Sequence, residues 1–106
     1  MNEHQKRLWD NMIDFIQEYL DGKTNDFYGV VGKLEGALDA SEIKDESLVK
    51  QWYEYWTPLE TRRAVEGNDV AKNDAIRELS SMKEFLLSKV GKNKERGQGA
   101  RSGNVK

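Results

Sequence analysis

The chain has 106 residues, of which 37% are hydrophobic and 34% are charged, and it contains no cysteine. This length suits one hydrophobic core and leaves too little chain for a second, and the lack of cysteine excludes disulfides, thiolate catalysis and cysteine-ligated metals. No window reaches the roughly 18 uncharged apolar residues of a membrane span, and the N-terminal segment has no apolar signal region, so we expect a cytoplasmic protein with no membrane contact.

The net charge is distributed unevenly along the chain. The formal charge is −2, but the last fifteen residues carry five basic side chains and one acidic side chain, which leaves −6 on the preceding residues. An acidic body repels nucleic-acid phosphates and favours a basic protein partner, although the same charge also serves solubility alone. We expect one folded domain over residues 1–91, which does not bind nucleic acid, and a flexible basic tail over residues 92–106 that has too few apolar groups to become ordered.

The first two apolar stripes predict two amphipathic helices. Residues 3–20 repeat apolar side chains every three or four positions, and Asp21-Gly22 supplies the stop because glycine adopts the left-handed conformation without a Cβ clash. One of residues 24–26 is expected to cap the second helix. That helix places a second apolar set on one face: Phe27, Val30, Val31, Leu34 and Leu38.

Three glycines lie on the opposite side of this second helix, at Gly29, Gly32 and Gly36. Each costs about 0.8–1 kcal/mol of helix propensity relative to alanine. One interpretation is a smooth groove for another helix or a partner backbone, which would make this face the seam of a self-associating protein. The other interpretation is a marginal, partly irregular helix with no role in binding.

The next segment predicts a third helix and a short separate helix. After a polar connection at residues 39–45, apolar side chains recur at helical spacing up to Trp56, where we expect the third helix to end. The sequence Thr57-Pro58-Leu59-Glu60 combines a threonine cap, proline at the first helical position and glutamate three residues after the cap. It predicts a new helix that continues to about residue 66.

The last helix is predicted to be long and to stop at Gly91. Its apolar residues are Val70, Ala71, Ala75, Ile76, Leu79, Met82, Phe85, Leu86 and Val90. No segment alternates apolar and polar residues with turn signals at its ends, so the sequence predicts no strands. The expected fold is all-α, a small antiparallel bundle of four to five helices followed by a disordered C-terminal tail.

Signatures of catalysis and of cofactor binding are missing from the sequence. The only histidine, His4, belongs to a first helical turn that should fray, which does not hold a base in fixed geometry. The sequence contains no Glu-x-x-His for a di-metal bundle, no phosphate-binding glycine loop and no G-x-S-x-G elbow. We therefore expect a protein that is not an enzyme and that binds no metal or cofactor.

The candidate partner-binding residues are acidic and aromatic. Five carboxylates surround the connection between the second and third helices: Glu35, Asp39, Glu42, Asp45 and Glu46. Four aromatic residues crowd into residues 52–56, so Tyr53 or Tyr55 must face outward, where tyrosine anchors interfaces. A solvated acidic face and a tyrosine at the core edge are the plain alternatives. Arg62 and Arg63 could pair with carboxylates of the body or serve a partner.

Three segments in this order, LWDNMIDFIQEYLDGK, DFYGVVGKLEGALD and QWYEYWTPLE, resemble small helical bacterial immunity proteins of the colicin-D type. The resemblance covers about residues 8–90 as a pattern, and it transfers no individual functional residue. In that family an acidic bundle plugs the positively charged active site of a nuclease toxin, so the resemblance implies a non-enzymatic inhibitor of a basic protein. The basic tail departs from that picture. The alternative is a self-associating structural protein, a homo-oligomer with its seam on the glycines of the second helix.

Overall fold

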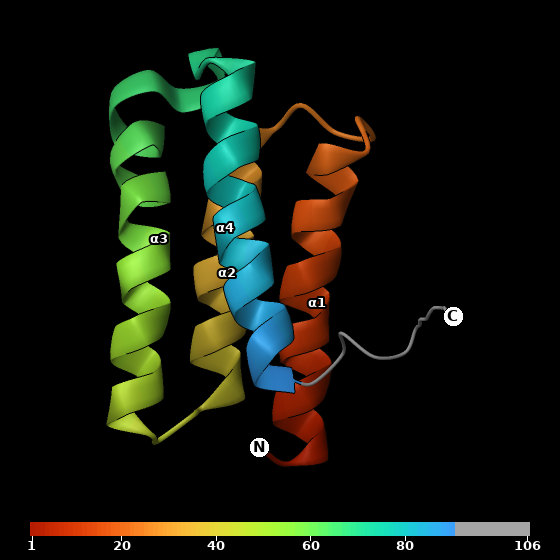
Figure 1. Ribbon diagram of the computed structural model, residues 1–106, viewed down its shortest axis with the longest axis vertical. Coiled ribbons are helices and arrows are strands. Elements are labelled where there is room, and N and C mark those ends of the chain that lie inside the picture. Colours follow the sequence, from red (N-terminus) through yellow and green to blue (C-terminus); the bar gives the residue numbers. More distant parts are fainter. Residues whose placement is uncertain (91–106) are drawn as a thin grey trace, which may run out of the picture.

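The computed structural model describes residues 1–90, which form four α-helices and one 3-10 turn and contain no strand. The elements are α1 (Glu3–Leu20), α2 (Phe27–Ser41), α3 (Glu46–Glu66), the 3-10 turn η1 (Gly67–Asp69) and α4 (Lys72–Val90). The helices run alternately up and down, and each packs against two neighbours, so that α1 lies between α2 and α4 and α3 closes the bundle (Figure 1). The predicted all-α bundle is confirmed. The predicted tail, residues 92–106, lies outside the described residues.

The core combines one apolar stripe from each helix. All five apolar residues predicted for the face of the second helix are buried, and Trp9, Leu34 and Leu79 are fully buried. Two assignments in the last stripe are wrong: Ala71 precedes the start of α4 and is exposed, and Ile76 lies on the outer side of α4 with 36% of its surface exposed. Spacing alone therefore identified the stripe but not its edges.

Side-chain caps set where the helices begin. In α2 the Asp26 carboxylate accepts from the backbone N–H of Gly29 at 2.9 Å, and in α3 the Asp45 carboxylate accepts from Leu48 at 3.1 Å. The pKa of Asp26 lies below its usual value, mainly because its carboxylate accepts the hydrogen bond from the backbone of Gly29 and, to a smaller extent, because it accepts one from the side chain of Asn68. These caps satisfy backbone donors that have no partner in the first helical turn.

The predicted break after Trp56 is wrong, because α3 continues as one helix of 21 residues with Pro58 inside it. The side chains of Trp52, Trp56 and Leu59 are all buried, at spacings of four and three residues. An uninterrupted helix keeps all three side chains on the core side, whereas a new helix that began at Pro58 in another direction would turn the side chain of Leu59 away from the core. Core packing therefore outweighs the cost of an internal proline, which is about 3 kcal/mol.

Three indole N–H groups connect helices through the core. Each tryptophan donates to a different helix: Trp9 to the carbonyl of Leu86 at 3.2 Å, Trp56 to the carbonyl of Val31 at 3.0 Å, and Trp52 to the sulfur of Met12 at 3.4 Å. The rings of Trp52 and Trp56 are stacked, with centroids 5.6 Å apart. A buried indole donor without a partner would destabilise the fold, so these contacts fix where each tryptophan can sit.

Candidate functional site

The structure separates the predicted partner-binding residues into two groups. Asp39, Glu42, Asp45 and Glu46 lie at the end of the bundle where α2 connects to α3 (Figure 1), and Glu35 lies about one helical turn before them in α2. The hydroxyl of Tyr53 donates to Glu35 at 3.2 Å. Tyr55 lies two residues further along α3, which turns it roughly 200° around the helix and towards α4. The seven residues therefore do not form one continuous surface.

Two of these five carboxylates already make contacts within the fold. The Asp45 carboxylate caps α3, whereas Glu42 ends α2 through its backbone alone, in the left-handed conformation with φ of 54°. Glu35 accepts the hydroxyl of Tyr53, and the pKa of Tyr53 is raised first by burial and then by this hydrogen bond and the negative charge of Glu35. These contacts account for two of the five carboxylates without a binding partner, so the acidic end is the weaker candidate.

The glycine face of α2 is partly filled by side chains of the same chain. A Cβ on Gly29 would come too close to the capping carboxylate of Asp26, and a Cβ on Gly32 would lie 3.0 Å from the guanidinium of Arg63. Only Gly36 has nothing within 4 Å of that position. α2 is also a regular helix from end to end, so the face offers no continuous open seam and no irregular segment.

Replacing Gly36 with alanine is expected to raise the free energy of unfolding by about 0.5–1 kcal/mol, because the added methyl enters open space on an α-helix. Chemical denaturation measures the change. In Gly32→Ala, the matched control, the Arg63 side chain must move and the gain should be smaller. If Gly36→Ala instead dissociated an oligomer in a sedimentation experiment, the glycine seam would be restored as an interface.

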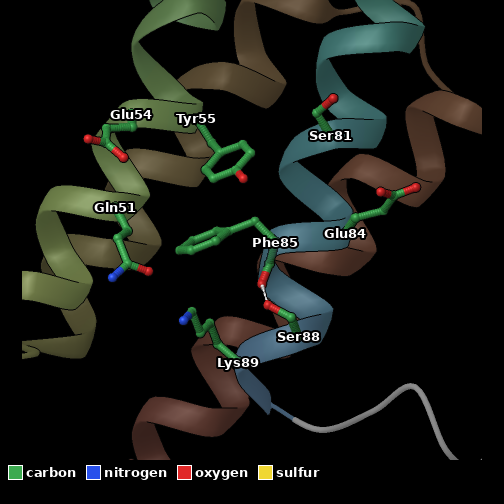
Figure 2. A pocket seen from close by; sticks show the side chains of 8 residues that line it. All are labelled: Gln51, Glu54, Tyr55, Ser81, Glu84, Phe85, Ser88 and Lys89. Atoms are coloured by element: carbon green, nitrogen blue, oxygen red, sulfur yellow. Dashed lines mark hydrogen bonds between the residues drawn. The ribbon is translucent and has the colours of Figure 1, made fainter.

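A groove between α3 and α4 contains Tyr55, the second of the two predicted tyrosines. Figure 2 shows the rings of Tyr55 and Phe85 projecting into it from the two helices, and they stack with centroids 4.7 Å apart and planes 18° apart. Tyr55 is 41% exposed, whereas Phe85 is 7% exposed and joins the stack to the core. The groove has a volume of about 580 Å³ and is lined by Gln51, Glu54, Tyr55, Ser81, Glu84, Phe85, Ser88 and Lys89.

Two further hollows continue the groove along the same pair of helices. The first, of about 280 Å³, shares Glu54, Tyr55 and Ser81 with the groove and adds Pro58 and Glu78. The second, of about 470 Å³, shares Pro58 and Glu78 with the first hollow. It adds Thr57, Thr61, Arg62, Val65 and Glu66. The α3–α4 groove, with both hollows included, therefore runs over much of the length of α3.

The charges along the α3–α4 groove differ between its two ends. At the end near η1, Arg62 donates to Glu78 at 2.8 Å and also lies 3.6 Å from Glu66. At the other end, no hydrogen bond or ion pair from Glu54 or Glu84 to another side chain is present within residues 1–90. These two carboxylates flank the aromatic pair, one on each helix. The groove therefore presents a stacked aromatic base between unpaired negative charges.

Of the seven acidic and aromatic residues predicted to bind a partner, only Tyr55 lines this groove. Arg62, which the sequence left open between an internal ion pair and a partner contact, lines the end near η1 and pairs with Glu78. Phe85 was assigned to the core, where most of its surface does lie, and the α4 residues around it were not singled out. A signal for them existed: Ser81, Glu84 and Ser88 recur at spacings of three and four residues beside an otherwise apolar stripe. What the sequence lacked was the knowledge that this polar stripe faces Tyr55.

The groove is suited to noncovalent recognition, since it offers aromatic faces, carboxylates and hydroxyls. His4 does not line it: its ring Nε2 lies 3.3 Å from the carbonyl oxygen of Ala40, at an exposed position. Residues 1–90 contain no cluster of acidic or histidine side chains that could hold a metal ion. Within the same residues, no helix combines the length and the apolar character required to cross a membrane.

Comparisons with protein families, with curated proteins and with solved structures give no match for this chain.

Proposed function

We propose that this protein is a non-enzymatic protein-binding domain and that the α3–α4 groove is its binding face. The observation that carries the proposal is the exposed ring of Tyr55, held in place by its stack on Phe85. A tyrosine fixed in this way offers a large contact area and loses little side-chain freedom when a partner binds. Such residues are typical anchors of protein interfaces.

The charge of the molecule supports a basic partner. The sequence before the last fifteen residues carries a net charge of −6, and the unpaired carboxylates of Glu54 and Glu84 lie beside the aromatic anchor. Complementary charge steers association and excludes acidic competitors. An inhibitor of the immunity or antitoxin kind, which covers a basic site on another protein, is the form of this function that fits the charge best.

Replacing Tyr55 with alanine is expected to weaken binding of the natural partner by at least about 30-fold, the loss typical of an interface hot spot. The experiment captures partners from native lysate on the immobilised full chain and then measures the dissociation constant with the purified partner. Tyr28→Ala is the matched control, because Tyr28 is 51% exposed but lies on α2 and does not line the groove. A partner that binds all three proteins equally would refute the groove as the binding face.

Self-association is the second candidate function. It is supported by Gly36, where no atom lies within 4 Å of the Cβ position and another helix could approach closely. Sedimentation equilibrium at high concentration tests it directly. A monomer across the whole concentration range would remove this candidate, whereas a dimer that is lost in Gly36→Ala but kept in Tyr55→Ala would replace the groove by the glycine face.

A further inference from the structure

The shape of the α3–α4 groove matches a helix. Its α3 side is lined by residues that recur every three or four positions, from Gln51 to Val65. The fourteen steps from Gln51 to Val65 span about 21 Å of α-helix, and a third helix can pack in the space between two neighbouring helices. The part of the α3–α4 groove that runs along α3 from Gln51 to Val65, the track, is therefore as long as about four turns of helix.

The solvent side of this track carries apolar groups that no described residue covers. Tyr55 is 41% exposed, Val65 is 78% exposed, and Pro58 between them is also exposed. All three lie on α3 and line the hollows along the track. Single exposed apolar residues are ordinary, but several in line along one groove mark a place where an apolar face can be buried.

The track is lined by more negative than positive side chains, so a bound helix with basic groups on both flanks would complement its charge. The lining contains four carboxylates, Glu54, Glu66, Glu78 and Glu84, and two basic side chains, Arg62 and Lys89. Arg62 is engaged by Glu78, and the Lys89 ammonium lies 5.7 Å from the centre of the Phe85 ring. Glu54 and Glu84 project to opposite sides of the groove (Figure 2), so that an occupant would meet them with its two edges.

We propose that the groove binds one amphipathic helix of about four turns from the partner, with apolar residues along one face and lysine or arginine on both flanks. This inference rests on the proposed binding function and names the chemistry of the partner. The apolar face covers Tyr55, Pro58 and Val65, and the basic flanks pair with Glu54 and Glu84.

Two other occupants are distinguishable from such a helix by their sequence. Residues 91–106 of the chain itself have five basic side chains, but apart from alanine and glycine their only apolar residue is Val105, so they cannot supply an apolar face. A second copy of residues 1–90 would bring further carboxylates to an acidic rim, since this part of the chain is itself acidic. Charge and apolar content therefore favour a basic helix from another protein.

The test selects ligands from a display library of random 16-residue peptides on the immobilised full chain. The dissociation constants of enriched peptides are then measured for the wild type, for Tyr55→Ala, for the double variant Glu54→Lys/Glu84→Lys and for the control Tyr28→Ala. Circular dichroism reports the helicity of each peptide before and after binding, and it also checks that every variant is folded.

We expect enriched peptides to carry lysine or arginine beside apolar residues spaced three and four apart, and to gain helicity on binding. Their affinity should fall at least about tenfold in the charge-reversed variant and in Tyr55→Ala, and should remain unchanged in Tyr28→Ala. Enriched peptides that depend on Tyr55 but are acidic, or that bind without gaining helicity, would overturn the inference and leave the groove as the binding face.

Two further outcomes would also overturn the inference. One is the absence of any peptide whose binding depends on Tyr55, in which case the lysate capture decides the proposed function separately. The other is a synthetic peptide of residues 91–106 that binds with the same dependence on Glu54 and Glu84, because it would identify the chain's own segment as the occupant.

Discussion

Replacing Trp52 with alanine is expected to lower the free energy of unfolding by about 3–5 kcal/mol, the range for loss of a buried large aromatic side chain. Trp52 is fully buried, stacks on Trp56 at 5.6 Å and donates its indole N–H to the sulfur of Met12. The substitution removes this packing and leaves a cavity between α3 and α1. Guanidinium denaturation followed by circular dichroism measures the loss.

Val65→Ala is the control for this prediction, because Val65 lies on the same helix and is 78% exposed. A substitution at such a surface position is expected to change stability by no more than about 0.5 kcal/mol. Equal effects of Trp52→Ala and Val65→Ala would mean that the side of α3 assigned to the core is wrong.

Replacing Pro58 with alanine is expected to raise the free energy of unfolding by about 1–3 kcal/mol, because proline inside a helix is much less favourable than alanine. Pro58 has no N–H to donate to the carbonyl of Glu54, and alanine restores that hydrogen bond within α3. Its side chain is exposed, so the change removes no core contact. Thermal and chemical denaturation both report the gain.

Thr57→Ala separates a continuous α3 from two helices that meet at Pro58. A threonine that capped a new helix would cost about 0.5–2 kcal/mol on replacement by alanine. In a continuous helix Thr57 is an interior, exposed residue, so alanine should leave stability equal or slightly higher. A clear loss in Thr57→Ala, together with no gain in Pro58→Ala, would reinstate the break.

The helices could be predicted from the sequence wherever the local signals and the packing agreed. The first helix was predicted with the bounds that the structure has, and at its C-terminal end the apolar stripe and the Asp21-Gly22 stop agree. The break at Pro58 was predicted from three local signals that ignore Leu59, whose burial needs the unbroken helix. The local cap and proline signals favour a helix boundary at Pro58, but the burial of Leu59 in the core favours a continuous helix and outweighs them.

The candidate site could be predicted only in part. The crowding of aromatic residues in one short segment was enough to require an outward tyrosine, and Tyr55 is that residue. The sequence could not show that Phe85 lies beneath it, because thirty positions separate the two residues and only the packing of α3 on α4 joins them. It also could not show that the Asp45 carboxylate caps α3 and that the Glu35 carboxylate accepts the hydroxyl of Tyr53, which made the acidic connection look more available than it is.

The indole donors of the three tryptophans have a consequence for the uniqueness of the native state. Stripes of leucine, valine and isoleucine tolerate sliding of one helix against another, since one apolar contact can replace the next at similar energy. An indole N–H that must reach the carbonyl of Leu86 or of Val31 has less freedom, because carbonyls on one face of a helix recur only once per turn, about 5.4 Å apart, and a smaller slide would leave the donor without an acceptor in the core. The tryptophans thereby hold the helices against small slides, and replacing them with phenylalanine should admit several packed states of similar energy, detectable as broadened amide resonances.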